Sequence, residues 1–167
     1  MAEILQTQRL YLREFTNNDA AFIVTLLNSA TFLKFIGDKK VRTLSEAENY
    51  LTNGPIKSYA ENGFGLWLYG LKETNKPIGM CGLIKRDTLA DIDIGYAMLP
   101  AYENKGYALE ISEATLNYGK TKLGINRIIA ITSKENIRSA RLLNKIGLHF
   151  EKNIQLGEGK EELMLFG

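Results

Sequence analysis

Residues 91–123 constrain the fold more than any other stretch, because their pattern changes from that of a strand to that of a helix. The first part alternates between two faces, as a strand does. Pro100 ends this strand, since proline cannot donate to a sheet ladder. The helical part carries apolar residues at spacings of four, three and four. The strand faces would hold Ile92, Ile94, Tyr96 and Met98 against Asp91, Asp93, Gly95 and Ala97, and the helix stripe would hold Tyr107, Ile111, Ala114 and Tyr118.

The loop around Gly106 joins this strand to this helix. Backbone N–H groups at a helix start have no intrahelical partner, and the helix dipole favours negative charge there. The stretch therefore predicts an anion-binding site.

The remaining elements follow from local patterns. A strand is expected over 4–15, a helix with an apolar stripe at 22–27, and a helix from about 43 to 62 that Gly54-Pro55 breaks or kinks. Short turns make the strands 64–71, 78–85 and 91–99 an antiparallel meander. The helix 106–123, the buried strand 127–132, the helix 136–146 and a hairpin of 150–156 with 162–166 complete the chain. This order predicts one α/β (α+β) domain over 1–167 around a mixed sheet.

Composition excludes several classes of function. The net charge of +2 is too balanced to suggest a nucleic-acid partner. One cysteine and one histidine argue against an internal disulfide and against a Cys/His metal site. No apolar run approaches the roughly 20 residues of a membrane span, and residues 1–10 lack a signal pattern. We therefore expect a cytoplasmic protein with no metal, no membrane and no nucleic acid.

Three motifs in this order resemble the GNAT superfamily of acetyl-CoA-dependent N-acetyltransferases, and most of all its ribosomal-protein N-terminal (alanine/serine) acetyltransferase branch. They are TQRLYLR at 7–13, IGYAMLPAYENKGYALE at 94–110 and NIRSARLLNKIGLHFE at 136–151. The resemblance implies a mostly antiparallel sheet of about seven strands flanked by about four helices, with a splay between the fourth and fifth strands. It also implies acetyl-CoA as the co-substrate and an amine as the acceptor.

The resemblance assigns the cofactor site residue by residue. Backbone N–H groups of the loop would cradle the pyrophosphate, and Gly106 would allow close approach because it has no Cβ. The exposed edge of the splayed strand would pair with the pantetheine arm, and Asn136, which also fits a helix N-cap, would bond that arm. Glu103 departs from the family, because it places a negative charge beside an anion site. The loop residues are Asn104, Lys105, Gly106, Tyr107 and Ala108, and the edge residues are Tyr96, Ala97, Met98 and Leu99.

The catalytic candidates are two. Asp93 matches the acidic position of the family and would act as the base, a role that Asp91 could share. A backbone N–H of Ala97 or Met98 would stabilise the oxyanion. In many members of the family a tyrosine acts as the general acid that protonates the leaving thiolate. Leu143 occupies the matching position here, so Ser139 is the nearest candidate for this acid.

Several functions stay open at this stage. Direct transfer to a primary amine is expected, since no nucleophile with an adjacent base is visible. A protein N-terminal α-amine suits a modest base, because its pKa is about 7.7–8 against about 10.4 for lysine. The alternatives are a small-molecule amine such as a polyamine or aminoglycoside, an acyl-CoA sensor with little catalysis, and a nucleotide-binding enzyme, which the lack of a Walker or dinucleotide motif argues against. The chain could be a monomer or a homodimer.

Overall fold

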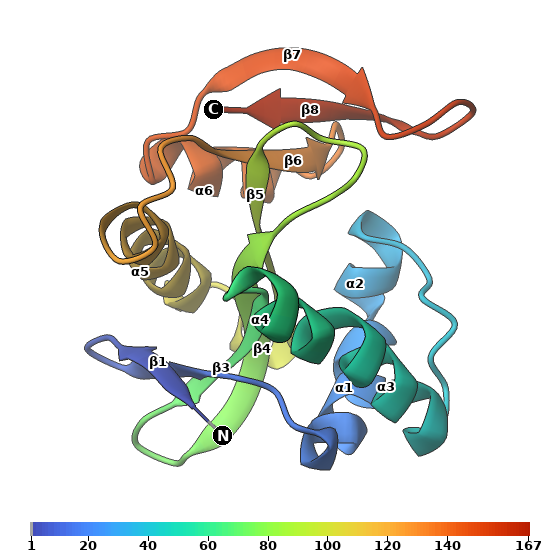
Figure 1. Ribbon diagram of the computed structural model, residues 1–167, viewed down its shortest axis with the longest axis vertical. Helices are drawn as coiled ribbons and strands as arrows, with labels where there is room; N and C mark the ends of the chain where they lie inside the picture. Colours follow the sequence, from blue (N-terminus) through green and yellow to red (C-terminus); the bar gives the residue numbers. More distant parts are fainter. Residues whose placement is uncertain (1) are drawn as a thin grey trace.

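The structure is a computed structural model that describes residues 2–167 and arranges them around one sheet of eight strands (Figure 1). The order across the sheet is β1-β2-β3-β4-β5-β6-β8-β7. Within residues 2–167 the β5–β6 pair is parallel and the other neighbouring pairs are antiparallel. The strands are β1 Glu3–Gln6, β2 Leu10–Arg13, β3 Leu66–Leu71, β4 Lys76–Ile84, β5 Ile92–Met98, β6 Ile128–Ser133, β7 Phe150–Gln155 and β8 Glu162–Phe166.

Helices cover both faces of the sheet, as its alternating apolar residues require. Trp67 and Cys81 belong to the core beneath α5 and α6, to which α5 contributes Ile111. Leu68 and Met80, which point the other way, pack against α1 and α3. The helices are η1 Asn17–Asp19, α1 Ala20–Leu27, α2 Ala30–Phe35, α3 Leu44–Leu51, η2 Thr52–Ile56, α4 Lys57–Asn62, η3 Pro100–Tyr102, α5 Tyr107–Thr121 and α6 Ile137–Lys145.

The meander and the final hairpin are confirmed. The single strand expected over 4–15 is wrong. A turn, in which Thr7 N–H donates to the Leu10 carbonyl at 2.9 Å, divides it into β1 and β2, which pair with each other. This accounts for eight strands rather than about seven. Sequence reasoning also missed α2, because it assigned no element between the helix at 22–27 and the helix that begins near 43. Pro55 sits in the π-helical turn η2, which separates α3 from α4 as predicted.

The buried face of α5 differs from the predicted stripe. Only Ile111 of that stripe is buried, together with Ser112, Thr115, Leu116 and Gly119. The reason is close approach to the sheet: a Cβ on Gly119 would lie 2.8 Å from Cδ1 of Ile128. Small and hydroxyl-bearing residues fit this narrow space, so the tyrosines flank it.

The predicted splay between the fourth and fifth expected strands is confirmed as a wedge between β5 and β6. The two strands pair only at Ile92–Ile128 and Asp93–Ile129. Beyond these pairs they separate, and the rest of β5 has no ladder partner on β6. No helix in the described chain has the length and apolar character needed to cross a membrane.

Candidate active site

The wedge between β5 and β6 presents backbone groups that no other strand uses. Leu99 N–H donates to the Ile78 carbonyl at 2.8 Å, on the β4 side. Because backbone groups alternate along a strand, Ala97 also faces β4, whereas Tyr96 and Met98 face the wedge. Of the two oxyanion candidates, Met98 is therefore the one whose N–H points into the opening. Ala97 and Leu99 lie at the predicted edge, but their backbone N–H groups face β4.

The loop before α5 has the backbone shape of an anion site. Asn104 and Gly106 are left-handed, with φ of 64° and 82°. Gly106 is the N-cap of α5, and no side chain caps this helix. The first-turn N–H groups, which include those of Tyr107 and Ala108, are thus left for another acceptor. Lys105 is exposed beside them.

Arg9 holds this loop through contacts with Lys105 and Glu110, a role that sequence reasoning missed. Its Nη1 donates to the Lys105 carbonyl at 2.9 Å, and its Nε donates to Glu110 Oε2 at 2.7 Å. The guanidinium also lies 4.4 Å from the centroid of the Tyr107 ring. Thr7 Oγ1 donates to the other oxygen of Glu110 at 2.6 Å. The first motif, residues 7–13, therefore contacts the loop of the second motif. The presence of Arg9 in one family motif and of Glu110 in another could have signalled this contact.

Glu103, whose negative charge lies beside the anion site, is paired with a cation. Its carboxylate accepts from Arg138 Nη1 at 2.6 Å and from Thr31 Oγ1 at 3.0 Å. The side chain is only 19% exposed, so it turns toward α2 and α6 rather than toward solvent. Its charge is thus neutralised by an arginine that sequence reasoning did not single out.

Asn136 and Ser139 lie at the start of α6, on the other side of the wedge. Asn136 Oδ1 accepts from Ser139 N–H at 3.1 Å, so the N-cap role is confirmed. Ser139 is buried near the Tyr96 phenol. Burial raises the pKa of Tyr96, and hydrogen bonding to Ser139 opposes this only in part, so the phenol stays protonated. Leu143 packs in the core.

Asp93 and Asp91 lie in different surroundings. Asp93 is 1% exposed and is paired with Arg86, whose Nε lies 2.9 Å from Oδ1. Burial raises the pKa of Asp93, while the bonds from Arg86 act to lower it. Asp91 is exposed and pairs with Arg127 at 3.1 Å. Each carboxylate therefore has its own cation, and the two do not form a shared site.

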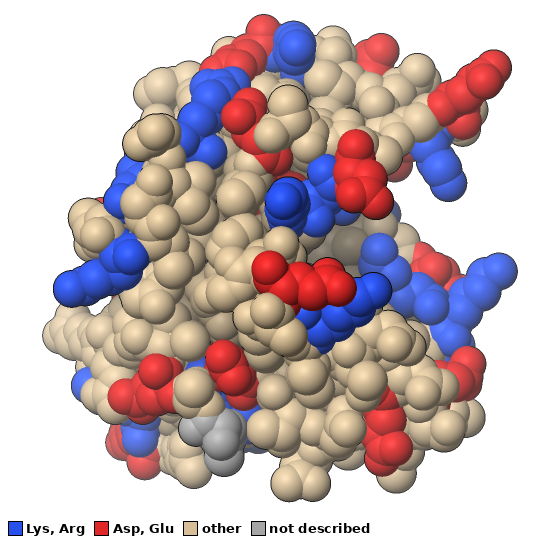
Figure 2. Space-filling view, viewed as in Figure 1, with Lys and Arg blue, Asp and Glu red and all other residues tan. Residues whose placement is uncertain are grey.

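The wedge fits an extended, amide-bearing ligand with an anionic end. Tyr96 and Met98 offer backbone groups along it, and the loop at 104–108 offers N–H groups at its open end. Ser133, at the end of β6, has a buried hydroxyl without a hydrogen-bond partner among residues 2–167. Figure 2 shows that the face carrying α2 and α4 is hollowed beside β5, with charged side chains around the rim.

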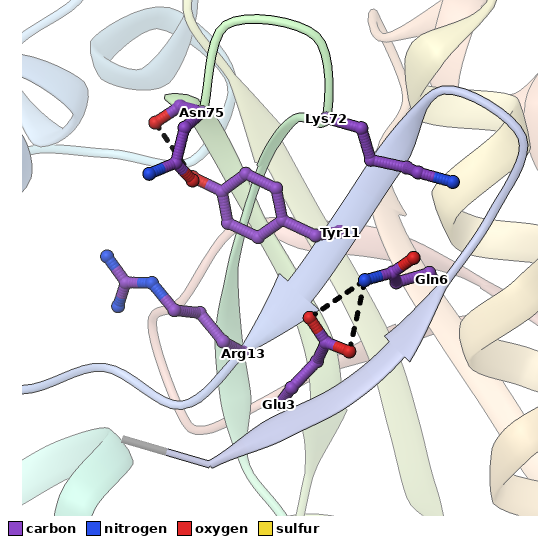
Figure 3. Close-up of a pocket in the computed structure, with 6 residues that line it drawn as sticks. All are labelled: Glu3, Gln6, Tyr11, Arg13, Lys72 and Asn75. Atoms are coloured by element: carbon purple, nitrogen blue, oxygen red, sulfur yellow. Dashed lines mark hydrogen bonds between the residues drawn. The ribbon is translucent and has the colours of Figure 1, made fainter.

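A separate pocket of about 470 Å³ lies toward the β1 edge of the sheet (Figure 3). Residues of β1, β2 and the β3–β4 turn line it, and Tyr11 Oη donates to the Asn75 carbonyl at 3.4 Å. It lacks the loop and strand edge described above. No group of three or more His, Cys, Asp or Glu residues in the described chain is placed to hold a metal ion.

The fold and the wedge define an acetyltransferase of the GNAT family, and comparison with known proteins agrees. The profile of the acetyltransferase (GNAT) domain matches residues 9–149, so the chain belongs to this family. Membership makes it an acetyl-CoA-dependent acetyltransferase.

Particular relatives extend this comparison. The uncharacterized N-acetyltransferase YnaD of Bacillus subtilis is 31% identical, over 88% of this chain and 83% of its own length. Two solved structures share the fold. A ribosomal L7/L12 α-N-protein acetyltransferase, RimL, in complex with coenzyme A superposes with a TM-score of 0.84 at 14% identity, covering 99% of this chain and 96% of RimL. Spermidine N-acetyltransferase of Vibrio cholerae, in complex with coenzyme A and spermine, superposes with a TM-score of 0.78 at 19% identity. The match covers 96% of this chain and 95% of that enzyme.

Proposed function

We propose that this protein transfers the acetyl group directly from acetyl-CoA to a primary amine, and that the amine is a protein N-terminal α-amine. The observation that carries the proposal is the wedge, which places an unpaired strand edge beside an uncapped helix start. Both reactants can then meet in one cleft, and proximity supplies a large part of the rate.

Each residue has a distinct task in this proposal. The N–H groups of residues 104–108 hold the pyrophosphate, and the backbone of Tyr96 and Met98 pairs with the pantetheine arm. Asn136 lies opposite, where its side-chain NH2 group can bond the same arm. The Met98 N–H stabilises charge on the carbonyl oxygen. Asp93 takes the proton of the amine, since burial raises its pKa toward a useful range.

The leaving thiolate requires a proton donor. Ser139 is the candidate that faces the wedge from α6, and Tyr96 stands beside it as a protonated phenol. The two hydroxyls together can supply the hydrogen bond that the absent family tyrosine would have given. No covalent intermediate is needed, so the reaction proceeds through a ternary complex.

The choice of an α-amine rests on chemistry and on likeness. An α-amine loses its proton more readily than the lysine side chain does. It therefore suits Asp93, whose basicity is reduced by the bonds from Arg86. The name of one structural neighbour specifies an α-N-protein substrate. The other neighbour acts on a polyamine, so a small-molecule amine is the second candidate.

The test is the release of free thiol from acetyl-CoA across matched acceptors. The panel would hold peptides beginning with Ala or Ser, the same peptides with a blocked N-terminus and an internal lysine, spermidine, and an aminoglycoside. Turnover only on free N-termini supports the proposal. Turnover only on spermidine or the aminoglycoside would show that the acceptor is a small-molecule amine and not a protein N-terminus. Tight coenzyme A binding without turnover would indicate a sensor instead.

A further inference from the structure

An ion pair spans the open end of the wedge. β5 and β6 run parallel and diverge toward their C-terminal ends. Glu103 follows β5, and Arg138 lies in the first turn of α6, which follows β6. The 2.6 Å contact between Arg138 Nη1 and Glu103 Oε2 therefore joins the two sides of the opening.

The two partners are held to different degrees. Glu103 is 19% exposed and is also fixed to α2 by Thr31. Arg138 is 62% exposed, and Glu103 is its one ion-pair partner in the described chain. The carboxylate is thus anchored, whereas the guanidinium is free to turn on its long side chain.

The position of the pair puts Arg138 close to the loop at residues 104–108, here called the anion loop. Glu103 directly precedes Asn104, the first left-handed residue of that loop. Guanidinium groups bind carboxylate and phosphate with the same planar set of donors, so one can replace the other.

We infer that Arg138 is a cofactor-binding residue whose partner in the free protein is Glu103 and in the complex is the pyrophosphate of coenzyme A. Glu103 then acts as an internal competitor for Arg138, and it keeps its bond to Thr31 when Arg138 leaves. This inference rests on the cofactor position in the proposed function, and it adds a side chain from α6 to the backbone N–H groups that would hold the pyrophosphate.

The inference predicts opposite effects for the two halves of one ion pair. Arg138→Gln should weaken coenzyme A binding about 10-fold, the loss of a hydrogen bond to a charged group. Glu103→Gln should tighten it about 2- to 5-fold, since a pair whose arginine is largely exposed is worth little and its removal frees Arg138. In an Arg138→Gln background, Glu103→Gln should change nothing. Isothermal titration calorimetry with coenzyme A and with dephospho-coenzyme A measures all of these.

Several outcomes would overturn the inference. If both single variants weaken binding, the pair organises the loop and does not compete with the cofactor. If Arg138→Gln loses affinity for coenzyme A but not for the dephospho form, its partner is the 3′-phosphate and not the pyrophosphate. Arg127→Gln is the matched control, because it removes the same charge from the opposite end of β6 and should leave binding within about 2-fold. Thermal melts establish that each variant is folded.

The two proposals fail separately. Opposite effects on coenzyme A binding without turnover on any amine would leave this inference standing and sink the acetyl transfer. Turnover on an amine, with both substitutions changing coenzyme A binding in the same direction, would support the acetyl transfer and overturn this inference. No coenzyme A binding by the unaltered protein would end both.

Discussion

At the scale of single residues, burial and charge compete at Asp93. Its carboxylate is almost fully buried, which raises its pKa, while Arg86 stabilises the ionised form. A folded-state pKa above the unfolded one means that this group's contribution to stability falls as pH rises through the folded pKa. A structural ion pair and a catalytic base have the same appearance here, and kinetics separate them.

Asp93→Asn should lower the acetylation rate of an α-amine about 100-fold, a typical loss for a general base. The loss should be largest below the pKa of the amine, about 7.7–8, where a proton must be removed. Initial rates from pH 6 to 9 measure this. Asp91→Asn, which alters the exposed pair with Arg127, is the control. A constant ratio of variant to unaltered rate across pH would show that Asp93 is not the base.

Cys81 is the only cysteine, and its surroundings make it inert. Burial raises the pKa of its thiol to about 11, although Thr115 and Ser112 bond to it. We expect no reaction of the native protein with an aromatic disulfide reagent at pH 7.5, and one thiol per chain after denaturation. The absorbance of the released thiolate measures both. Stoichiometric labelling of the native protein within minutes would contradict the buried position.

At the scale of elements, the β1–β2 turn and the start of α5 form one unit through Glu110. Burial acts to raise the pKa of Glu110, but hydrogen bonds from Thr7 and Arg9 outweigh it, so the pKa is lowered. A lowered pKa gives stability that is present above the unfolded value and is lost as pH falls through the folded one.

Glu110→Gln should therefore lower the free energy of unfolding by about 2 kcal/mol at pH 7, the scale of hydrogen bonds to a charged group. The difference should shrink as pH falls below the ordinary glutamate pKa of about 4.3, and it should vanish only when the native carboxylate is protonated as well. Urea melts at several pH values measure it. Glu113→Gln, an exposed change one turn on, is the control. A difference that does not depend on pH would exclude the ionised link.

The anion loop can be tested with two glycines of similar conformation. Gly106 and Gly63 have φ of 82° and 78°, so alanine at either should cost about 1–2 kcal/mol of stability. A Cβ on Gly106 would lie 3.3 Å from Arg9 Nη2, whereas a Cβ on Gly63 meets nothing within 4 Å. We expect Gly106→Ala to weaken coenzyme A binding at least 10-fold, because the helix start shifts. Gly63→Ala should leave binding unchanged. Equal affinities measured by calorimetry would refute the loop assignment.

At the scale of the whole molecule, the sheet consists of two parts that meet at two residue pairs. The strands β1 to β5 form one part, and β6 to β8 form the other. The parallel pairing stops after Asp93 and Ile129, so the site is the line along which the sheet opens. The position of the site thus follows from the topology.

Amide hydrogen exchange should report this opening directly. In the free protein, the amides of Tyr96 and Met98 should exchange at least 10-fold faster than those of Ala97 and Leu99, which face β4. Coenzyme A should slow the first pair and leave the second pair unchanged. Spectra of the 15N-labelled protein with and without the cofactor measure each amide. Equal protection of all four amides in the free protein would show that the wedge is closed.

Local patterns in the sequence were sufficient for much of the fold. The meander, the break at Gly54-Pro55, the cap at Asn136 and the final hairpin depend on neighbours within a few residues, and all are confirmed. The split of 4–15 and the buried face of α5 were missed, because a distant partner decides each: Glu110 for the turn, and the sheet for the helix.

The site divides in the same way. The sequence indicated the loop and the strand of the candidate site, because a glycine, a proline and a change of periodicity leave a local signature. Only the tertiary structure decided which charges meet there. Arg9 with Glu110, Arg86 with Asp93 and Arg138 with Glu103 join residues on different elements, two of these pairs far apart in the chain. Pairing of this kind depends on where the folded chain brings side chains together, and no hydrophobic periodicity in the sequence encodes it.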